Sequence, residues 1–402
     1  MHIKTNYRVS ANIDLSAIRH NLTQMSNHIG PDKKIMAVVK ADAYGHGAVP
    51  VATSVQNLPF LWGFGVATVD EAIELRKAKI KKPILVFGCV FPDETQDVVT
   101  YDIIATIYTL ETAQALNQVA KDSNRKVKAH IKVDTGMTRL GFLPTDENAH
   151  VVAQIIEMPY LEIEGVFTHY AKADEKDLSF TYKQHDKCFA FSNKVNHLLE
   201  NRESDKGFDK DKFQSLRNNQ EGPRALQFHC SNSGGIISYP ESHCDLVRAG
   251  ISMYGYYPSE DVSKDKVKLQ PALTLTSHIS YVKEVEEGTP VSYGGTYVTT
   301  KPMKIATIPV GYGDGYPRSL SNLGEVLIGG KRCKILGRVC MDQFMVDVSH
   351  LSDVKMMDPV VLVGGMGEEE ITVGELSDLS GRFNYEFLCC LTKRIPRNYV
   401  NH

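Results

Sequence analysis

The stretch IMAVVK at residues 35–40 is the first of eight short apolar runs whose order along the chain decides the fold. The other seven are LWGFGVA (61–67), PILVFG (83–88), IIATIY (103–108), VKAHIKVD (127–134), LEIEGVFTH (161–169), LQFHCSNS (226–233) and DLVRAGISMYG (245–255). Most of them are hydrophobic without alternation, which is typical of parallel strands buried on both faces. Between the runs lie amphipathic segments such as LETAQALNQVAKDS (110–123), whose apolar residues recur at three- and four-residue steps.

Eight strand–helix units within about 250 residues predict a (β/α)8 barrel of the TIM type. An open doubly wound sheet also alternates strands with helices, but its usual strand count is about six. One segment interrupts the alternation, because residues 201–222 are charged and polar with little to bury. We expect these residues to form an exposed insertion between the sixth helix and the seventh strand.

A second domain of mostly β structure is expected after the barrel. Its strand-like runs are joined by Gly- and Pro-rich turns, and they are TLTSHISYVKEV (274–285), TPVSYGGTYV (289–298), KIATIPVGYG (304–313), KRCKILGRV (331–339), QFMVDV (343–348) and PVVLVGG (359–365). Only TVGELSDLSG (372–381) has a helical pattern there. The sequence therefore predicts a barrel over residues 1–265 and a β domain over residues 266–402.

Composition excludes several classes of partner. The formal net charge is -3 and no basic patch stands out, so a nucleic-acid partner is not expected. No apolar run approaches the roughly 20 residues that span a bilayer, and the N-terminus lacks a secretory signal, so no membrane contact is expected. The eight cysteines include no CxxC pair, and we expect reduced thiols, no metal site and a cytoplasmic protein.

Polar residues stand where the predicted barrel strands end, which is where barrel enzymes place their active sites. They are Lys40 after the first strand, Asp134 and Arg139 after the fifth, His169 after the sixth, Ser231, Asn232 and Ser233 after the seventh, and Arg248, Gly250 and Ile251 on the eighth. A lysine at the end of a buried strand loses hydration, which lowers its pKa and prepares the amine to form a Schiff base. The alternative is a lysine that ends a strand and extends to water.

The segment VVKADAYGHG (38–47) resembles the pyridoxal phosphate lysine motif of the alanine racemases. The resemblance continues in the family's order through KVDTGMTRLGF (132–142), GVFTHYAKAD (165–174), HCSNSGG (229–235), VRAGISMYG (247–255), VSYGGTY (291–297), PVGYGDGY (309–316), GRVCMDQ (337–343) and NYE (384–386). It implies a cofactor-binding barrel followed by a β domain, and a pyridoxal 5'-phosphate enzyme that interconverts L-alanine and D-alanine for peptidoglycan synthesis. It also implies a homodimer, in which the β domain reaches the active site of the other subunit.

The resemblance assigns cofactor contacts to particular residues. Lys40 would carry the cofactor and act as one proton-transfer base, and Arg248 would face the pyridine nitrogen. Because an arginine keeps its proton, that nitrogen would stay unprotonated and transamination would be restrained. The phosphate would be held by Tyr44, Ser233, Gly250, Ile251 and Tyr385, and the cofactor-binding set also includes Arg139, His169 and Asn232.

The second base that the resemblance implies is Tyr293, coupled to Arg248 through His169. A phenol has a reference pKa near about 10, so this tyrosine needs a cationic environment. Arg139 and the backbone N–H of Met341 would hold the substrate carboxylate. Asp342 and Tyr312 would line the entrance, and Lys132 would be a carbamylated lysine that orients Arg139 or would lie beside a bound anion.

Three other functions remain open from the residues. A serine or serine/alanine racemase differs little, because a pocket of this kind rejects an added hydroxyl weakly. A single-barrel pyridoxal phosphate carrier would lack the β domain. A basic-amino-acid decarboxylase shares the two-domain plan, but it places a carboxylate where Arg248 stands.

Overall fold

The chain forms two compact units in a computed structural model, which describes residues 8–201 and 226–401. One unit comprises residues 19–41 and 48–270, and we call it the barrel unit. The other comprises residues up to 18, residues 42–47 and residues from 271 onward, and we call it the β unit. The insertion predicted at 201–222 lies, apart from its first residue, outside the described residues.

The barrel unit contains all eight predicted strands, and each strand overlaps the apolar run that predicted it. They are β2 (Lys34–Val38), β3 (Leu61–Val66), β4 (Ile84–Val86), β5 (Ala105–Ile107), β6 (Val127–Lys132), β7 (Leu161–Phe167), β8 (Gln227–His229) and β9 (Leu246–Ala249). Neighbouring strands pair in parallel from β2 to β4 and from β5 to β8. The expected parallel strands are confirmed.

The strands close into a ring. Strand β9 pairs in parallel with β2, and a parallel bridge between Leu85 and Ile104 joins β4 to β5. The Arg248 N–H donates to the carbonyl of Ser231 at 3.0 Å, which links β9 to the end of β8. The closed order confirms the predicted barrel and excludes the open doubly wound sheet.

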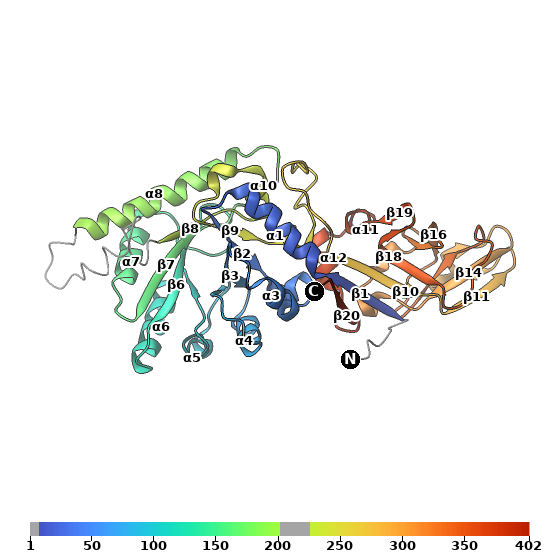
Figure 1. Ribbon diagram of the computed structural model, residues 1–402, viewed down its shortest axis with the longest axis horizontal. Helices are drawn as coiled ribbons and strands as arrows, with labels where there is room; N and C mark the ends of the chain where they lie inside the picture. Colours follow the sequence, from blue (N-terminus) through green and yellow to red (C-terminus); the bar gives the residue numbers. More distant parts are fainter. Residues whose placement is uncertain (1–7, 202–225, 402) are drawn as a thin grey trace. The chain divides into compact units, whose positions relative to one another are not determined.

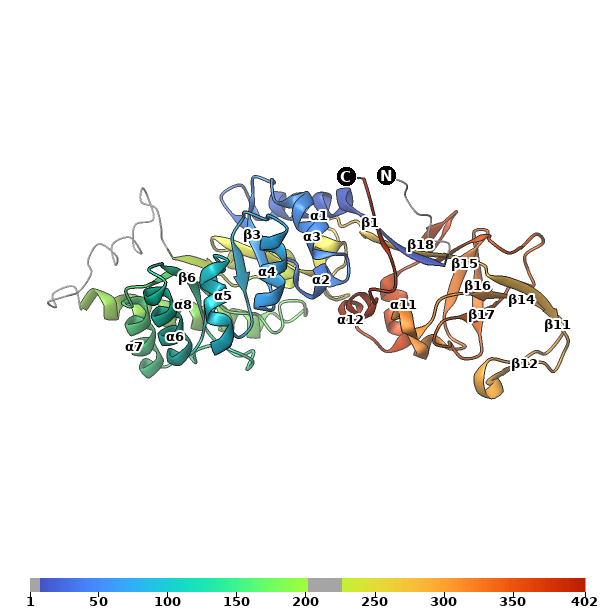
Figure 2. The same cartoon turned by 90° about the horizontal axis from the view of Figure 1, so that it is seen from below.

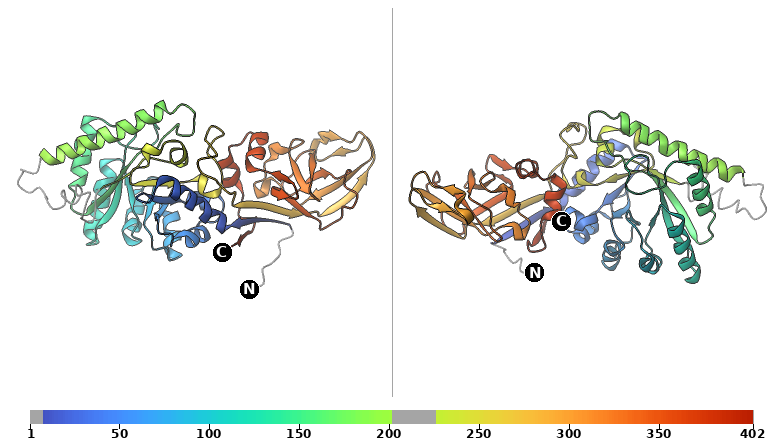
Figure 3. Two further views of the ribbon diagram at one scale, coloured as in Figure 1. Left: turned by 45° about the horizontal axis from the view of Figure 1, so that its top comes forward. Right: turned by 180° about the vertical axis from the view of Figure 1, so that it is seen from behind.

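Helices lie outside the barrel strands (Figures 1 and 2). They are α1 (Leu15–Ile29), α3 (Ala48–Val55), α4 (Val69–Lys77), α5 (Thr95–Thr100), α6 (Leu110–Asp122), α7 (Asp146–Ile156), α8 (Ser179–Asn201) and the short α10 (Ser233–Ser238). Helix α8, green in Figure 3, packs against α7. Within residues 8–201 and 226–401, no helix combines the length and the apolar character that a membrane span requires.

Threonine begins three of these helices in the same way. The side chains of Thr68, Thr109 and Thr145 accept hydrogen bonds from backbone N–H groups in the first turns of α4, α6 and α7. Such a cap satisfies a donor that the helix cannot pair internally. In α4, Glu71 completes a capping box by accepting from the N–H of Thr68.

The turn that follows the first barrel strand is left-handed. Residues 41–44 of α2 (Lys40–Tyr44) have φ between 51° and 54°, and none of them is glycine. A left-handed conformation costs L-residues about 1–2 kcal/mol each, so four in succession need support from their surroundings. Part of that support is a hydrogen bond from the Ala41 N–H to Glu71 Oε1 at 2.7 Å. Strain of this kind is typical of functional sites.

The β unit is built around one large sheet. Its strand order is β11-β14-β17-β16-β15-β18-β10-β1-β20, with β19 paired to β18. The strands are β1 (Val9–Asp14), β10 (Leu273–His278), β11 (Tyr281–Val285), β14 (Met303–Ile308), β15 (Glu325–Ile328), β16 (Lys331–Leu336), β17 (Phe344–Asp347), β18 (Pro359–Met366), β19 (Glu369–Ile371) and β20 (Arg397–Val400). A separate hairpin pairs β12 (Pro290–Val291) with β13 (Tyr297–Val298). The mostly β architecture confirms the expectation for this part of the chain.

Three parts of the β unit differ from the sequence analysis. The predicted helix is α11 (Val373–Ser380), but a second helix, α12 (Asn384–Cys390), lies beside it (Figure 2). Strands β15, β19 and β20 also went unrecognised in the sequence. Strand β1, which the sequence assigned with residues 1–265, lies inside the β sheet between β10 and β20. It pairs antiparallel with β10 and parallel with β20, and both partners come from distant segments of the chain.

Candidate active site

Arg248, on β9, is the buried cation of the barrel. Its side chain is 3% exposed. Its terminal nitrogens donate to the carbonyls of His229 at 2.6 Å, Thr168 at 2.8 Å and Cys230 at 2.9 Å, and they also lie 3.0 Å from Nδ1 of His229 and 3.3 Å from Nδ1 of His169. The charge is therefore held by neutral acceptors, and Arg248 Nε makes no hydrogen bond to a described residue.

A second carbonyl-bound arginine shows what is special about Arg248. Arg76, at the end of α4, donates from its terminal nitrogens to the carbonyls of Ile80, Lys82 and Asp102, and from Nε to that of Tyr101. These acceptors precede β4 and β5, at the end of the barrel opposite to active sites. Nε and both terminal nitrogens of Arg76 therefore donate to protein, whereas only the terminal nitrogens of Arg248 do so among the described residues.

Two buried histidines support Arg248 from behind. His229 Nε2 lies 2.8 Å from His130 Nδ1, and both residues are fully buried. Burial, followed by the nearby charge of Arg248, holds the pKa of His229 well below its usual value, and burial lowers the pKa of His130 to about 3. Both rings are therefore neutral at physiological pH, and His229 accepts from Arg248 while it donates to His130.

The ends of β8 and β9 form a cradle of backbone N–H groups. Ser233 is 4% exposed, and its Oγ accepts from the N–H of Gly250 at 3.1 Å and of Ser252 at 3.4 Å. Asn232 caps α10 by accepting from the N–H of Gly235, and its amide donates to the carbonyl of Tyr170 at 3.1 Å. Together with the buried Ile251, these contacts fix the loop in which barrels often bind phosphate.

Cations surround His169 at the same rim. Burial is the largest cause of a pKa well below the usual value of His169, and the charges of Arg248, Arg139, Lys132 and Lys40 each lower it further. We call these four residues the cationic rim. The structure thus brings together four residues that the sequence placed on three different strands and a loop. Their combined positive charge suits an anionic ligand.

Lys132 is the most deeply buried lysine of the rim. It is 5% exposed, donates to the carbonyl of Val133 at 3.1 Å and lies over the Phe167 ring. Burial, with the charge of Arg248 as a second cause, lowers the pKa of Lys132 to about 7. Arg139 is exposed, on a loop that Asp134 fixes by accepting from the N–H groups of Gly136 and Thr138.

The candidate residues of the β unit lie at its surface. Tyr293 is 72% exposed, Met341 52% and Tyr312 42%, and the side chain of Asp342 is also exposed. The N–H of Tyr312 donates to the carbonyl of Cys340 at 3.1 Å, so the GYGDGY and CMDQ segments lie side by side. In the same unit, the rings of Tyr44 and Tyr385 are 5.9 Å apart.

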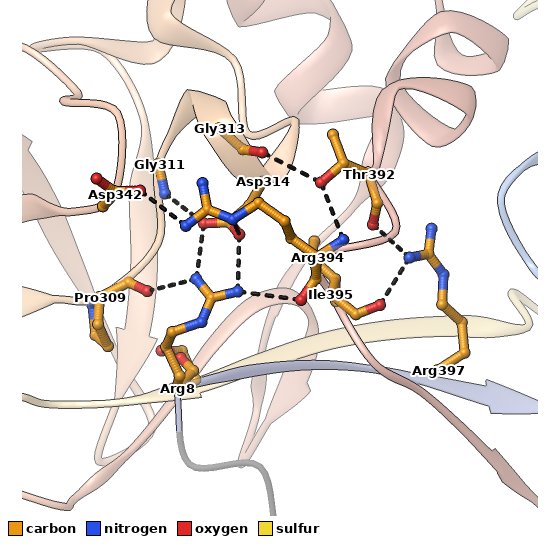
Figure 4. A network of polar contacts seen from close by, with 11 residues as sticks. Arg8, Pro309, Gly311, Gly313, Asp314, Asp342, Thr392, Arg394, Ile395 and Arg397 are labelled. Carbon is orange, nitrogen blue, oxygen red and sulfur yellow. Dashed lines mark hydrogen bonds and ion pairs between the residues drawn. The ribbon is translucent and has the colours of Figure 1, made fainter.

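Asp314 holds these exposed segments in place through a network of polar contacts (Figure 4). Its carboxylate is fully buried and accepts from both terminal nitrogens of Arg8, at 2.8 and 2.9 Å, and from the N–H of Gly311. Arg394 lies 3.6 Å from the same carboxylate and also binds Asp342 at 2.8 Å. The carboxylate therefore connects the segment that carries Tyr312 to the one that carries Asp342.

Three supporting residues escaped the sequence analysis. Glu71, His229 and Asp314 hold the turn after Lys40, Arg248 and the GYGDGY segment, respectively. Asp314 had a visible signal, because an acidic residue between two glycines suits a turn that binds its own backbone. Glu71 has the spacing of a capping box with Thr68, but its contact with Ala41 had no local signal. His229 had none, since its partner Arg248 lies on another strand.

Known proteins resemble the chain over nearly its whole length. The family model described as "Alanine racemase, N-terminal domain" matches residues 13–204 and 197–258, and "Alanine racemase, C-terminal domain" matches residues 272–399. An alanine racemase of Desulforamulus reducens is 42% identical over 390 residues, covering 97% of this chain and 98% of the relative. An alanine racemase of Clostridium perfringens is 42% identical over 392 residues, covering 97% and 95%.

Solved structures agree with these relatives. The alanine racemase of Clostridium difficile matches with a TM-score of 0.88 and 38% identity, covering 99% of this chain and 97% of that one. The alanine racemase of Bacillus anthracis with bound L-Ala-P matches with a TM-score of 0.86 and 33% identity, covering 99% and 96%.

Proposed function

Since the chain belongs to the alanine racemase family, we propose that it interconverts L-alanine and D-alanine with pyridoxal 5'-phosphate as its cofactor. The observation that carries this proposal is the available Nε donor of Arg248 within the cationic rim. The D-alanine would supply peptidoglycan synthesis. The basic-amino-acid decarboxylase is disfavoured, because it needs a carboxylate where this guanidinium lies.

The residues of the barrel rim suit the cofactor chemically. Arg248 Nε would donate to the pyridine nitrogen, and the loop N–H groups around Ser233, Gly250 and Ile251 would bind the phosphate, with Asn232, Tyr44 and Tyr385 beside them. The bound cofactor supplies a conjugated ring that disperses the negative charge left when the substrate Cα loses its proton. Because Arg248 keeps its own proton, it limits how far the ring withdraws electrons, which favours return of the proton to Cα.

Racemisation requires removal of a proton from one face of Cα and delivery of another to the opposite face. We assign the first face to Lys40, which carries the cofactor, and the second to Tyr293. His169 is neutral, and donors face both of its ring nitrogens: an Arg248 nitrogen lies 3.3 Å from Nδ1 and the Asn232 amide nitrogen 3.4 Å from Nε2. We assign the acceptor role to Nδ1, because it faces the charged donor at the shorter distance, and the N–H to Nε2. That N–H would stabilise the tyrosine oxygen when the phenol has given up its proton.

The exposure of the β-unit residues supports a homodimer with shared active sites. A tyrosine base works poorly in contact with bulk water, because solvent weakens the electrostatic interactions that lower its pKa. We therefore propose that Tyr293, Met341, Tyr312 and Asp342 complete the barrel site of the second subunit. The Met341 N–H and Arg139 would hold the substrate carboxylate there.

The state of Lys132 follows from its burial. With a pKa of about 7, much of its amine is uncharged at neutral pH and can add to carbon dioxide. We propose a carbamate at this position, which would place a negative charge beside Arg139 and orient its guanidinium. An unmodified ammonium would instead add a fourth positive charge to the rim.

The test is direct assay of the purified dimer. With pyridoxal 5'-phosphate and L-alanine we expect D-alanine to form, and more slowly D-serine from L-serine. Lys40→Ala should lose both racemisation and the visible absorption of the bound cofactor. Lys34→Ala, an exposed lysine at the other end of β2, is the matched control and should behave as the unmodified protein.

Each possible failure has a distinct meaning. Absence of D-alanine with cofactor bound would contradict the proposed reaction and leave a pyridoxal phosphate carrier. Racemisation of L-serine that is faster than that of L-alanine would show that serine is the preferred substrate. Persistence of the visible absorption in Lys40→Ala would contradict the assignment of that lysine.

A further inference from the structure

Three cysteines and one histidine converge in the barrel unit. His185 and Cys188 lie one turn apart on α8, Cys230 directly follows β8, and Cys244 precedes β9. One ring nitrogen of His185 and the sulfurs of Cys230 and Cys244 all lie within 4.8 Å of one another. Cys188 and Cys230 are fully buried. We call these four residues the thiol cluster.

Cys188 extends this group from the same helix as His185. Side-chain hydrogen bonds join the Cys230 sulfur to the sulfurs of Cys188 and Cys244. The Cys188 sulfur is not among the atoms that all lie within 4.8 Å of one another, so it would move toward the ion to complete a set of three sulfurs and one imidazole nitrogen.

The surroundings hold these donors in place. The hydroxyl of the buried Tyr170 lies 2.8 Å from His185 Nδ1, and Cys244 Sγ lies 3.3 Å from the carbonyl of Ser242. Such contacts behind a ligand fix its orientation and are typical of metal centres. Free cysteines pack as small apolar residues. Packing of the thiols therefore does not explain why an imidazole is held among them.

A nearby cation matches the charge that a metal centre would carry. A Zn²⁺ ion with three thiolates and a neutral imidazole has a net charge of -1 by the arithmetic 2 − 3. The buried guanidinium of Arg248 donates to the carbonyl of Cys230 at 2.9 Å. Its positive charge would compensate a single negative charge at the cluster, so the compensation does not depend on the state of Lys132.

We propose that Cys188, Cys230, Cys244 and His185 bind a Zn²⁺ ion in a closed structural site. Three sulfurs and one nitrogen form one of the common tetrahedral sets for structural zinc. Zinc–sulfur bonds of about 2.3 Å place neighbouring sulfurs about 3.8 Å apart, which the separation of at most 4.8 Å between the Cys230 and Cys244 sulfurs allows. Binding would release the thiol protons to solvent as the thiolates form.

The zinc site would help to fix Arg248 of the cationic rim. It joins α8, the end of β8 and the segment before β9, and the carbonyl of Cys230 is one of the acceptors that hold Arg248. Zinc binding would therefore stabilise the position of the Arg248 guanidinium. The cysteine spacing in the sequence did not indicate a metal because the four donors come from three elements and no two cysteines form a CxxC pair.

The first experiment measures metal in the reduced holoenzyme by elemental analysis after equilibration with zinc and a competing chelator. We expect about one zinc per chain. Cys244→Ser and His185→Asn should each weaken zinc binding at least tenfold. Cys333→Ser, a buried cysteine of the β unit, and His197→Asn, an exposed histidine on α8, are the matched controls and should bind zinc normally.

A second measurement uses the unmodified chain, so that it does not depend on the folding of a variant. Cobalt(II) in place of zinc should give the intense red-region bands of a tetrahedral thiolate site, where the cofactor does not absorb. Removal of the metal should lower the melting temperature by roughly 5 °C or more. Absence of tight zinc binding, a cobalt spectrum of octahedral type, or unchanged binding in Cys244→Ser and His185→Asn would overturn the proposal.

Discussion

The two units prepare their candidate residues in opposite ways. In the barrel unit, Arg248, Ser233 and Lys132 are buried and held by hydrogen bonds, whereas in the β unit Tyr293 and Met341 are exposed. Burial makes a charge respond strongly to its neighbours, while exposure leaves it screened by water. The buried barrel residues are therefore fixed in place for the proposed cofactor, and the exposed residues of the β unit would acquire their proposed chemistry only when another surface covers them.

The units also neutralise buried charge differently. The hydrogen bonds of Arg248 to described residues go to carbonyl oxygens and histidine rings, while Asp314 is paired with Arg8 and Arg394. A cation whose hydrogen-bond partners are neutral can still act on a ligand. A carboxylate paired with two arginines contributes to the position of its loops instead. Arg248 is thus suited to the proposed role at the cofactor, whereas Asp314 fixes the scaffold.

The largest effect should come from the exposed side of this comparison. Tyr293→Phe removes the proposed second base, so turnover should fall about 10²–10⁴-fold while the cofactor stays bound. Assays in both directions, together with the visible absorption of the cofactor, measure the two effects. Tyr281→Phe, another exposed tyrosine of the β unit, is the control. Normal turnover in Tyr293→Phe would exclude it as a base.

The two carbonyl-bound arginines offer the next test. Arg248→Lys and Arg76→Lys should each lower the free energy of unfolding by about 2 kcal/mol, because a lysine cannot reach several carbonyls at once. Only Arg248→Lys should also slow racemisation, by about 10²-fold, since only that arginine has a donor left for the cofactor. Urea unfolding and the racemase assay separate the two. Equal losses of activity would contradict the distinction.

Asp314 tests the scaffold role in the β unit. Asp314→Asn removes a fully buried carboxylate from two arginines, and its unfolding free energy should fall by about 3 kcal/mol. This value is at the low end for buried pairs because both arginines are partly exposed and can regain water. Thermal unfolding measures the change, with the exposed Asp378→Asn as the control. Unchanged stability would show that the network in Figure 4 makes no net contribution to the free energy of unfolding.

The smallest effect concerns pH and Lys132. Its pKa is about 7 in the folded protein against 10.5 when exposed, so the folded state gives up the proton first as pH rises. The cost of burying the ammonium is full below pH 7 and shrinks toward pH 10.5. Lys132→Met should therefore stabilise the protein more at pH 6 than at pH 9, by about 2 kcal/mol.

Melting curves in carbonate-free buffer check this difference. Lys128→Met, on the same strand but facing Glu164, is the control. Added bicarbonate should reduce the pH effect in the unmodified protein if a carbamate forms. A stabilisation by Lys132→Met that grows with pH would show that the burial cost has the opposite sign.

The sequence predicted most of the fold because its signals are local. Eight continuous apolar runs are sufficient to indicate eight parallel strands, and Lys40, His169, Asn232 and Arg248 follow as the residues at their ends. Strands β15, β19 and β20 were missed because segments of three or four residues are too short to show a period. Strand β1 was assigned to the wrong unit because its own pattern does not show which sheet it joins. Helix α12 was missed because its seven residues are too few for a clear period.

The sequence by itself therefore determined the barrel, the mostly β second unit and the placement of Lys40 at the end of the first apolar strand. Only the tertiary structure decided that residues 41–44 form a left-handed turn, that Arg248 retains its Nε donor and that the thiol cluster assembles from distant segments. Periodicity reports which face of one element is buried. Which donors remain unused, and which distant side chains meet, depends on contacts between elements that no local pattern records.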